Sequence, residues 1–181
     1  MVASKQTAFA LWITGLPASG KSTLTTALKT ELARRGIDIA VLESDNLRKI
    51  LTPHPRYDEA EREIFYQQMA YIGALLVEHG VPVIFDATAN LRVYRSRARD
   101  QIQRFLEIYV DSPASVCTAR DPKGIYRQAQ EGGTATVPGV QALYEPPETA
   151  DLIVHGDREN PVAAAQRVAE LLEAKGYIRR I

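Results

Sequence analysis

The stretch GLPASGKST, residues 15–23, decides the fold. It completes the pattern Gly15-x-x-x-x-Gly20-Lys21-Ser22, the phosphate-binding loop (P-loop) of nucleotide-binding proteins. The loop follows an apolar run and opens a helical pattern, so backbone N–H groups and the positive helix end are expected to point at the β and γ phosphates. The alternative without a ligand, a glycine turn with an exposed lysine and serine, explains less of the motif.

The positions of this loop have separate expected tasks. Gly15 and Gly20 permit the backbone conformation, while Lys21 reaches the β and γ oxygens and neutralises charge that moves during transfer. The Ser22 hydroxyl is expected to bind Mg²⁺. The candidate nucleotide-binding residues of the loop are Gly15, Ala18, Ser19, Gly20, Lys21, Ser22 and Thr23.

Short apolar runs alternate with helical patterns along the chain. These runs do not alternate between apolar and polar residues, because nearly every position is apolar. That pattern indicates parallel strands that are buried on both faces. Leu24, Leu28 and Leu32 give the first helix an inward stripe, and a helix over about 161–175 closes the chain. The sequence therefore predicts a doubly wound α/β fold with a five-stranded parallel sheet flanked by helices. The expected strands are 8–14, 37–42, 81–86, 105–111 and 151–154.

Bulk composition predicts one domain over residues 1–181, with 45% hydrophobic residues for its core. Lys plus Arg equal Asp plus Glu at 22 each, so no global field draws the protein to nucleic acid or membrane. The single cysteine, Cys117, has no internal disulfide partner and is interpreted as a buried small hydrophobe. The apolar run before Gly15 is too short for a signal peptide or membrane span, which favours a cytoplasmic location.

Residues from about 121 to 147 do not fit the alternation. They are rich in Gly, Pro and polar residues and lie between the fourth and fifth expected strands. A loop this long in a compact domain is usually functional or disordered. We interpret it as an active-site lid, because ligands bind such sheets on this side.

The segment VLESDNLRKIL, residues 41–51, carries polar groups where the second strand ends. Transfer of a phosphoryl group to a hydroxyl needs a carboxylate to take the proton and cations to hold an anionic acceptor. Asp45 and Arg48 supply both, with Asn46 beside them. The alternative is that Asp45 caps the next helix and Arg48 is solvated.

The third strand runs into VIFDATANLRVYR, residues 83–95. Asp86 ends an apolar run as a Walker-B-type acid does in small-molecule and polynucleotide kinases, where it holds Mg²⁺ through water. Arg92 or Arg95 is a candidate to face an anionic acceptor. The alternative for Asp86 is a cap on the following turn.

Several motifs together resemble the adenylylsulfate kinase family, which uses MgATP to phosphorylate the 3′-hydroxyl of adenosine 5′-phosphosulfate. The resemblance covers most of the chain in order and implies a five-stranded P-loop kinase fold with a lid, ATP and Mg²⁺ as cofactors, and a homodimer. The motifs are GLPASGKST, SDNLR, VDSPASVCTARDPKGIYRQAQEGG and VPGVQALYEPPE.

The resemblance also implies residue roles. Asp45 matches the aspartate assigned as general base, and Arg48 and Arg62 match arginines that bind the acceptor. Arg120 matches the arginine that packs on the ATP adenine, and Lys123 matches the lid lysine.

Three departures from the family pattern affect the acceptor half of the site. Ser44 replaces a glycine, Phe65 replaces an amide that bonds the acceptor, and Val137 replaces an aromatic ring that stacks on its base. Stacking is worth about 1 to 3 kcal/mol per base, and Tyr57, Phe65 and Tyr144 are candidates to compensate. The leading expectation is adenylylsulfate kinase activity. A kinase for another nucleotide-linked or sugar-like anion and a nucleotide-binding regulatory protein with little turnover remain alternatives.

Overall fold

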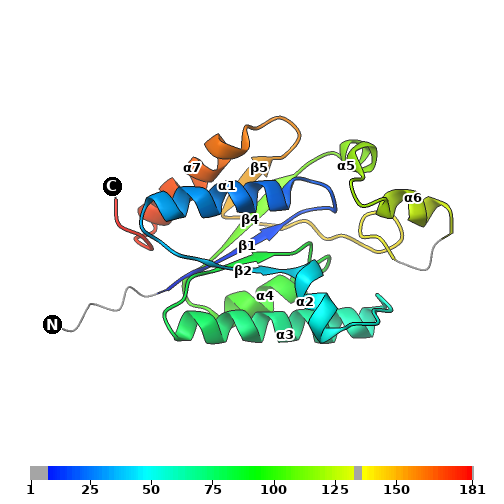
Figure 1. The fold of residues 1–181 in the computed structure, drawn as a ribbon, viewed down its shortest axis with the longest axis horizontal. Coiled ribbons are helices and arrows are strands. Elements are labelled where there is room, and N and C mark those ends of the chain that lie inside the picture. Colours follow the sequence, from blue (N-terminus) through cyan, green and yellow to red (C-terminus); the bar gives the residue numbers. More distant parts are fainter. Residues whose placement is uncertain (1–7, 133–135, 181) are drawn as a thin grey trace.

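The computed structural model describes residues 8–132 and 136–180 (Figure 1). Its centre is a five-stranded, all-parallel sheet with the order β2-β3-β1-β4-β5. The first strand lies in the middle, and the chain builds one side of the sheet before crossing to the other. This reversal leaves a crevice at the carboxyl end of β1, where such sheets bind ligands. The strands are β1 (Ala10–Thr14), β2 (Ala40–Glu43), β3 (Val83–Asp86), β4 (Phe105–Asp111) and β5 (Leu152–His155).

Helices cover both faces of the sheet. Figure 1 shows α1 (Lys21–Arg34) and α7 (Pro161–Ala174) on one face, and α3 (Glu59–Glu78) and α4 (Arg92–Gln101) on the other. Three shorter helices lie near the carboxyl edge or beyond it. They are α2 (Ser44–Leu51), α5 (Ala114–Arg120) and α6 (Ile125–Gln130).

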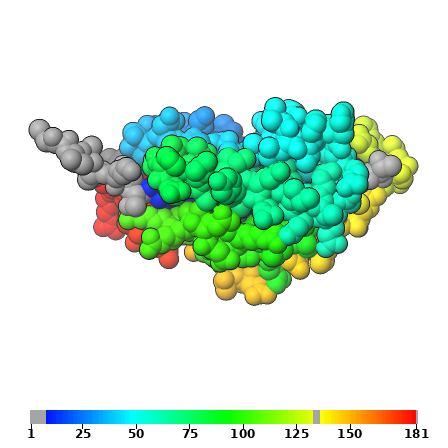
Figure 2. All heavy atoms as spheres, turned by 90° about the horizontal axis from the view of Figure 1, so that it is seen from below, coloured from blue at the N-terminus to red at the C-terminus, as the bar shows by residue number. Residues whose placement is uncertain are grey.

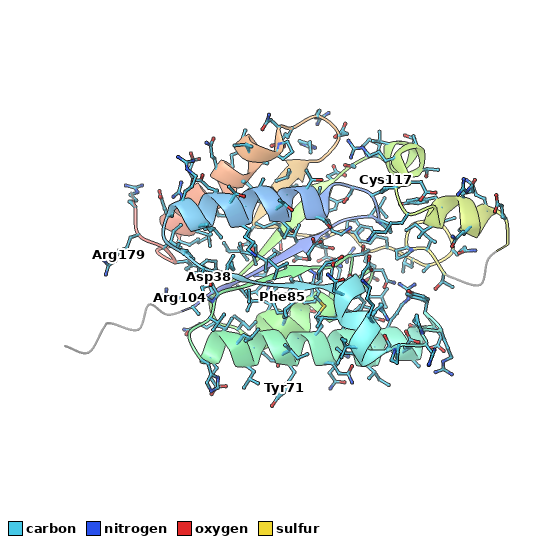
Figure 3. The ribbon with its side chains drawn as sticks, viewed as in Figure 1. Asp38, Tyr71, Phe85, Arg104, Cys117 and Arg179 are labelled. Atoms are coloured by element: carbon cyan, nitrogen blue, oxygen red, sulfur yellow. The ribbon has the colours of Figure 1, made fainter. Side chains whose placement is uncertain are left out.

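Two apolar clusters, one on each face, hold these layers together. On the α1 face, the predicted stripe of Leu24, Leu28 and Leu32 is buried against β1 and α7. On the α3 face, the ring of Trp12 stacks on Phe85 with centroids 4.6 Å apart. Figure 3 shows Phe85 between the sheet and α3. Every residue of β1 and β3 is thus buried, which is why these two strands are almost entirely apolar.

The fold prediction is confirmed. All five apolar runs form parallel strands, although four of them begin later than expected or end one residue beyond the expected end. The interpretation of Cys117 as a buried hydrophobe is also confirmed, because it is fully buried beside Tyr126 and burial raises its pKa. Residues 1–7, 133–135 and 181 of the expected domain and lid lie outside the described residues. No described helix is long and apolar enough to cross a membrane.

Candidate active site

A cavity of about 1300 Å³ lies at the carboxyl edge of the sheet. Its wall combines the P-loop, the ends of β2, β3 and β5, the α2 region and part of the expected lid. In Figure 2 the cyan α2 region and the yellow lid segment lie together at one end of the molecule. The cavity is large enough for more than one small-molecule ligand, as a two-substrate enzyme requires.

The P-loop has the conformation that its glycines permit. Gly15 and Gly20 have φ of 151° and 109°, in the region that favours glycine. Ala18 also has a positive φ, 60°. The Ser112 hydroxyl donates to the Ser19 carbonyl oxygen at 2.8 Å and ties the loop to the end of β4. Gly20, Lys21, Ser22 and Thr23 line the cavity.

Lys21 is folded onto its own loop. Its Nζ donates to the carbonyl oxygens of Gly15 and Leu16 at 3.0 and 2.8 Å. Burial lowers the pKa of Lys21 to about 8, although nearby Asp86 opposes that shift. A cation held this way is placed to exchange carbonyl partners for phosphate oxygens.

Three carboxylates gather where β2 and β3 end. The strand register places Glu43 directly beside Asp86, and Asp45 follows in the first turn of α2. Burial, reinforced by the charge of Asp45, raises the pKa of Glu43. Asp45 is more than half exposed and forms an ion pair with Lys123. The predicted base and the predicted lid lysine are therefore in contact across the cavity.

Ser22 and Asp86 both line the cavity, and both offer hard oxygen ligands. Within the described residues, no group of three or more His, Cys, Asp and Glu side chains is arranged to hold a metal ion. Mg²⁺ in kinases is held by one or two protein oxygens together with substrate phosphates and water. The donors present fit that pattern, and such an ion would neutralise phosphate charge.

Arg48 and Arg62 are buried in the wall of the cavity at the end near α2 and α3. Arg48 forms an ion pair with Glu61 at 2.9 Å, and its guanidinium lies 3.8 Å from the centroid of the Phe65 ring. Arg62 bonds to the Tyr57 carbonyl oxygen at 3.0 Å. Both residues implied by the resemblance are thus at one site.

Arg120, which the resemblance implies packs on the ATP adenine, lines the cavity, and its guanidinium donates to the Gly156 carbonyl oxygen at 3.0 Å. Sequence reasoning missed Gly156, Asp157 and Arg158, which line the same part of the cavity after β5. A glycine two residues after the expected end of the fifth strand was the available signal, since it allows close backbone approach.

Four predicted site residues are not part of the cavity wall: Gly15 and Ser19, which belong to the P-loop, and Asn46 and Arg92. Asn46 is exposed on α2 and accepts a hydrogen bond from Lys49. Arg92 donates to the Pro146 carbonyl oxygen at 2.8 Å and forms an ion pair with Glu148. Arg95, the other arginine considered on α4, is buried against Glu107. These three side chains connect surface or core elements and are not placed to contact an acceptor.

The departures from the family pattern now have locations. Phe65 is fully buried beneath Arg48, so its ring offers no face to a ligand. The Tyr144 hydroxyl bonds to Thr14 Oγ1 at 3.3 Å, and its ring is not in the wall. Val137 packs with Cys117 and Tyr126. Of the three candidate rings, Tyr57 lines the cavity.

Comparisons with known proteins agree with this geometry. The family model for adenylylsulphate kinase matches residues 7–155. The adenylyl-sulfate kinase of Microcystis aeruginosa is 34% identical over 97% of both chains, and that of Escherichia coli is 33% identical over 93% of this chain and 85% of its own.

A solved structure of the Mycobacterium tuberculosis APS kinase CysC, in complex with AMPPNP and APS, superimposes with a TM-score of 0.85. It is 32% identical and covers 92% of this chain and 98% of its own. This chain belongs to the adenylylsulphate kinase family of ATP-dependent P-loop kinases.

Proposed function

We propose that this protein transfers the γ-phosphoryl group of ATP to the 3′-hydroxyl of adenosine 5′-phosphosulfate. The observation that carries the proposal is one cavity that joins the P-loop lysine, the Asp45 carboxylate and two arginines. Phosphoryl transfer is largely a matter of positioning and charge stabilisation, and these groups supply both.

In this reaction Asp45 orients the acceptor hydroxyl and takes its proton as the oxygen bonds to the γ-phosphorus. The bond from that phosphorus to the bridging oxygen breaks, and ADP leaves with the electron pair. Lys21 offsets the charge on the β and γ phosphates. Arg120 packs on the adenine of ATP. Bound Mg²⁺, held by Ser22 and through water by Asp86, would neutralise phosphate charge.

The acceptor end supports an anionic, ring-containing acceptor. Arg48, Arg62 and Lys123 supply positive charge, and Tyr57 supplies the aromatic face. A second candidate is the same chemistry on another nucleotide-linked or sugar-like anion. The specific observation in its favour is that Phe65 and Val137 are both buried, so neither replaces the polar and stacking contacts of the family pattern.

The test is coupled release of ADP with MgATP and adenosine 5′-phosphosulfate, run beside a panel of other nucleotide and sugar acceptors. Asp45→Asn is expected to slow turnover by about two to four decades. Asp38→Asn, on the exposed loop before β2, is the matched control and should leave turnover unchanged. Turnover of another acceptor alone would move the proposal to the second candidate. Nucleotide binding without Asp45-dependent turnover of any acceptor would indicate a nucleotide-binding regulatory protein instead.

We also propose that the protein acts as a single-domain cytoplasmic homodimer, on the basis of the family resemblance and of the composition. Light scattering on the purified full chain tests this assembly. A monomer at enzyme-assay concentrations would contradict it.

A further inference from the structure

The buried guanidinium of Arg62 has no hydrogen-bonded carboxylate among the residues that the structure describes. Arg62 is 6% exposed. Its hydrogen bonds go to the Tyr57 carbonyl oxygen, the Asn90 side-chain oxygen and both oxygens of Thr136, and all of these acceptors are neutral. No carboxylate among residues 8–132 and 136–180 forms an ion pair with it. A buried, uncompensated cation is costly, so this environment favours an anionic ligand.

Arg48, the other arginine at the acceptor end, differs from Arg62 because it is paired with a carboxylate. Its guanidinium is paired with Glu61 at 2.9 Å and lies over the ring of Phe65. The charge of Arg48 is therefore already balanced within the protein. Of these two arginines at the acceptor end, Arg62 is the one that brings net positive charge to the cavity.

The orientation of Arg62 is fixed by a side chain at each end of its guanidinium group. The Thr136 hydroxyl accepts from Arg62 at 2.9 Å and donates to the Tyr57 carbonyl oxygen at 2.8 Å. On the other side, Asn90 Oδ1 accepts from Arg62 at 3.2 Å. These contacts use four of the five guanidinium N–H groups and leave one, with the full charge, for a ligand.

Asn90 also connects Arg62 to the chain that follows Val137. Its Nδ2 donates to the Leu143 carbonyl oxygen at 2.9 Å, and its own carbonyl oxygen accepts from the Glu145 N–H at 2.8 Å. Asn90 is 5% exposed and is not part of the cavity wall. It therefore acts on a ligand only through Arg62 and the segment that it holds.

We propose that Asn90 and Thr136 are positioning residues of the acceptor site, which direct the unneutralised charge of Arg62 at the anionic group of the acceptor. The inference rests on the proposed function in requiring an anionic acceptor. It goes further in assigning two side chains that specify where that anion lies. Loss of either changes acceptor affinity while the P-loop, on the other side of the cavity, is untouched.

The first test compares isosteric and conservative variants by steady-state kinetics. Thr136→Val removes the hydroxyl and keeps the shape, Thr136→Ser keeps the hydroxyl, and Asn90→Ala removes the second contact. We expect Thr136→Val and Asn90→Ala to raise the KM for adenosine 5′-phosphosulfate about tenfold, because each loses a hydrogen bond to a charged group. The KM for ATP should change less than twofold, and Thr136→Ser should rescue the acceptor KM. Thr30→Val, on the exposed side of α1, controls for the substitution itself.

A parallel rise in both KM values, an equal defect in Thr136→Ser, or an unchanged acceptor KM would overturn the proposal. Hydrogen exchange of the ligand-free protein supplies a readout that needs no acceptor. Asn90→Ala should speed exchange of the Glu145 amide at least tenfold over Thr30→Val, and unchanged exchange would refute the role of Asn90. If wild-type protein does not turn over adenosine 5′-phosphosulfate, the proposed function fails while the exchange experiment still decides the positioning role.

Discussion

Adding one methyl group at Gly156 is expected to weaken ATP binding by displacing the P-loop. A Cβ built on Gly156 would lie 2.1 Å from the Ser19 carbonyl oxygen and 2.8 Å from Ser112 Oγ, distances that real Cβ atoms essentially never show. Relief requires a shift of about 1 Å, and misplacement of that size can cost about 100-fold in a positioned site. Overpacking of this kind typically lowers the free energy of unfolding by about 1 to 3 kcal/mol.

Gly73→Ala is the matched control. Gly73 shares with Gly156 a φ outside the left-handed region, and its Cβ would lie 2.0 Å from the tip of the Phe85 ring, in the core on the α3 face. Both variants should lose stability in urea denaturation. Calorimetric titration with a non-hydrolysable ATP analogue should show affinity lowered about 10- to 100-fold for Gly156→Ala alone. Equal affinity of the two variants would refute the claim that Gly156 sets the position of the loop.

Three further predictions follow from individual contacts. Raising the pH from 7 to 9 should weaken ATP binding roughly tenfold, because burial lowers the pKa of Lys21 to about 8 and its positive charge is lost above that pH. An ATP affinity that does not change with pH would contradict this. Lys21→Arg should remove the pH dependence of ATP binding. Lys123→Met should change the free energy of unfolding by less than about 1 kcal/mol, since the ion pair between Lys123 and Asp45 is mostly exposed. Turnover should nevertheless fall. Urea denaturation measures the change in stability, and ADP release measures turnover. Phe65→Leu should raise the acceptor KM by removing the ring beneath Arg48, a cation–π contact worth about 0.5 to 2 kcal/mol; an unchanged acceptor KM would show that Glu61 alone holds Arg48.

The fold could be predicted because its determinants are local. Five apolar runs, a glycine-rich loop and leucines at helical spacing each report structure within a few residues, and together they specify the layers. No residue range was predicted for α4 or α5, and α6 lies within residues 121–147, which were expected to form a loop. Helix α4 is rich in arginine and has only a weak apolar stripe. An arginine, Arg95, is buried next to Tyr94 on the side that faces the core.

The candidate site was predictable only in part. The P-loop and Asp45 could be placed because each comes directly after a strand, and the sequence predicts where those strands end. The assignment of Arg92 as an acceptor ligand had no such support, because the direction of a side chain on α4 depends on Glu148 and Pro146, more than 50 residues away. A sequence motif shows that an arginine is present, but it does not show which group pairs with that arginine in the folded protein.

The same limit explains why the two acceptor arginines look alike in sequence and differ in structure. Arg48 finds Glu61 at a separation of 13 residues, and Arg62 meets Thr136 at a separation of 74. Whether a buried cation is neutralised depends on every group that folds around it, so charge available to a ligand is a property of the tertiary structure. Arg48 lies over the ring of Phe65 and is paired with Glu61, whereas no described carboxylate forms an ion pair with Arg62. We therefore expect Arg62→Gln to raise the acceptor KM more than Arg48→Gln does, and steady-state kinetics on the two variants, with the ATP KM as internal control, decide it.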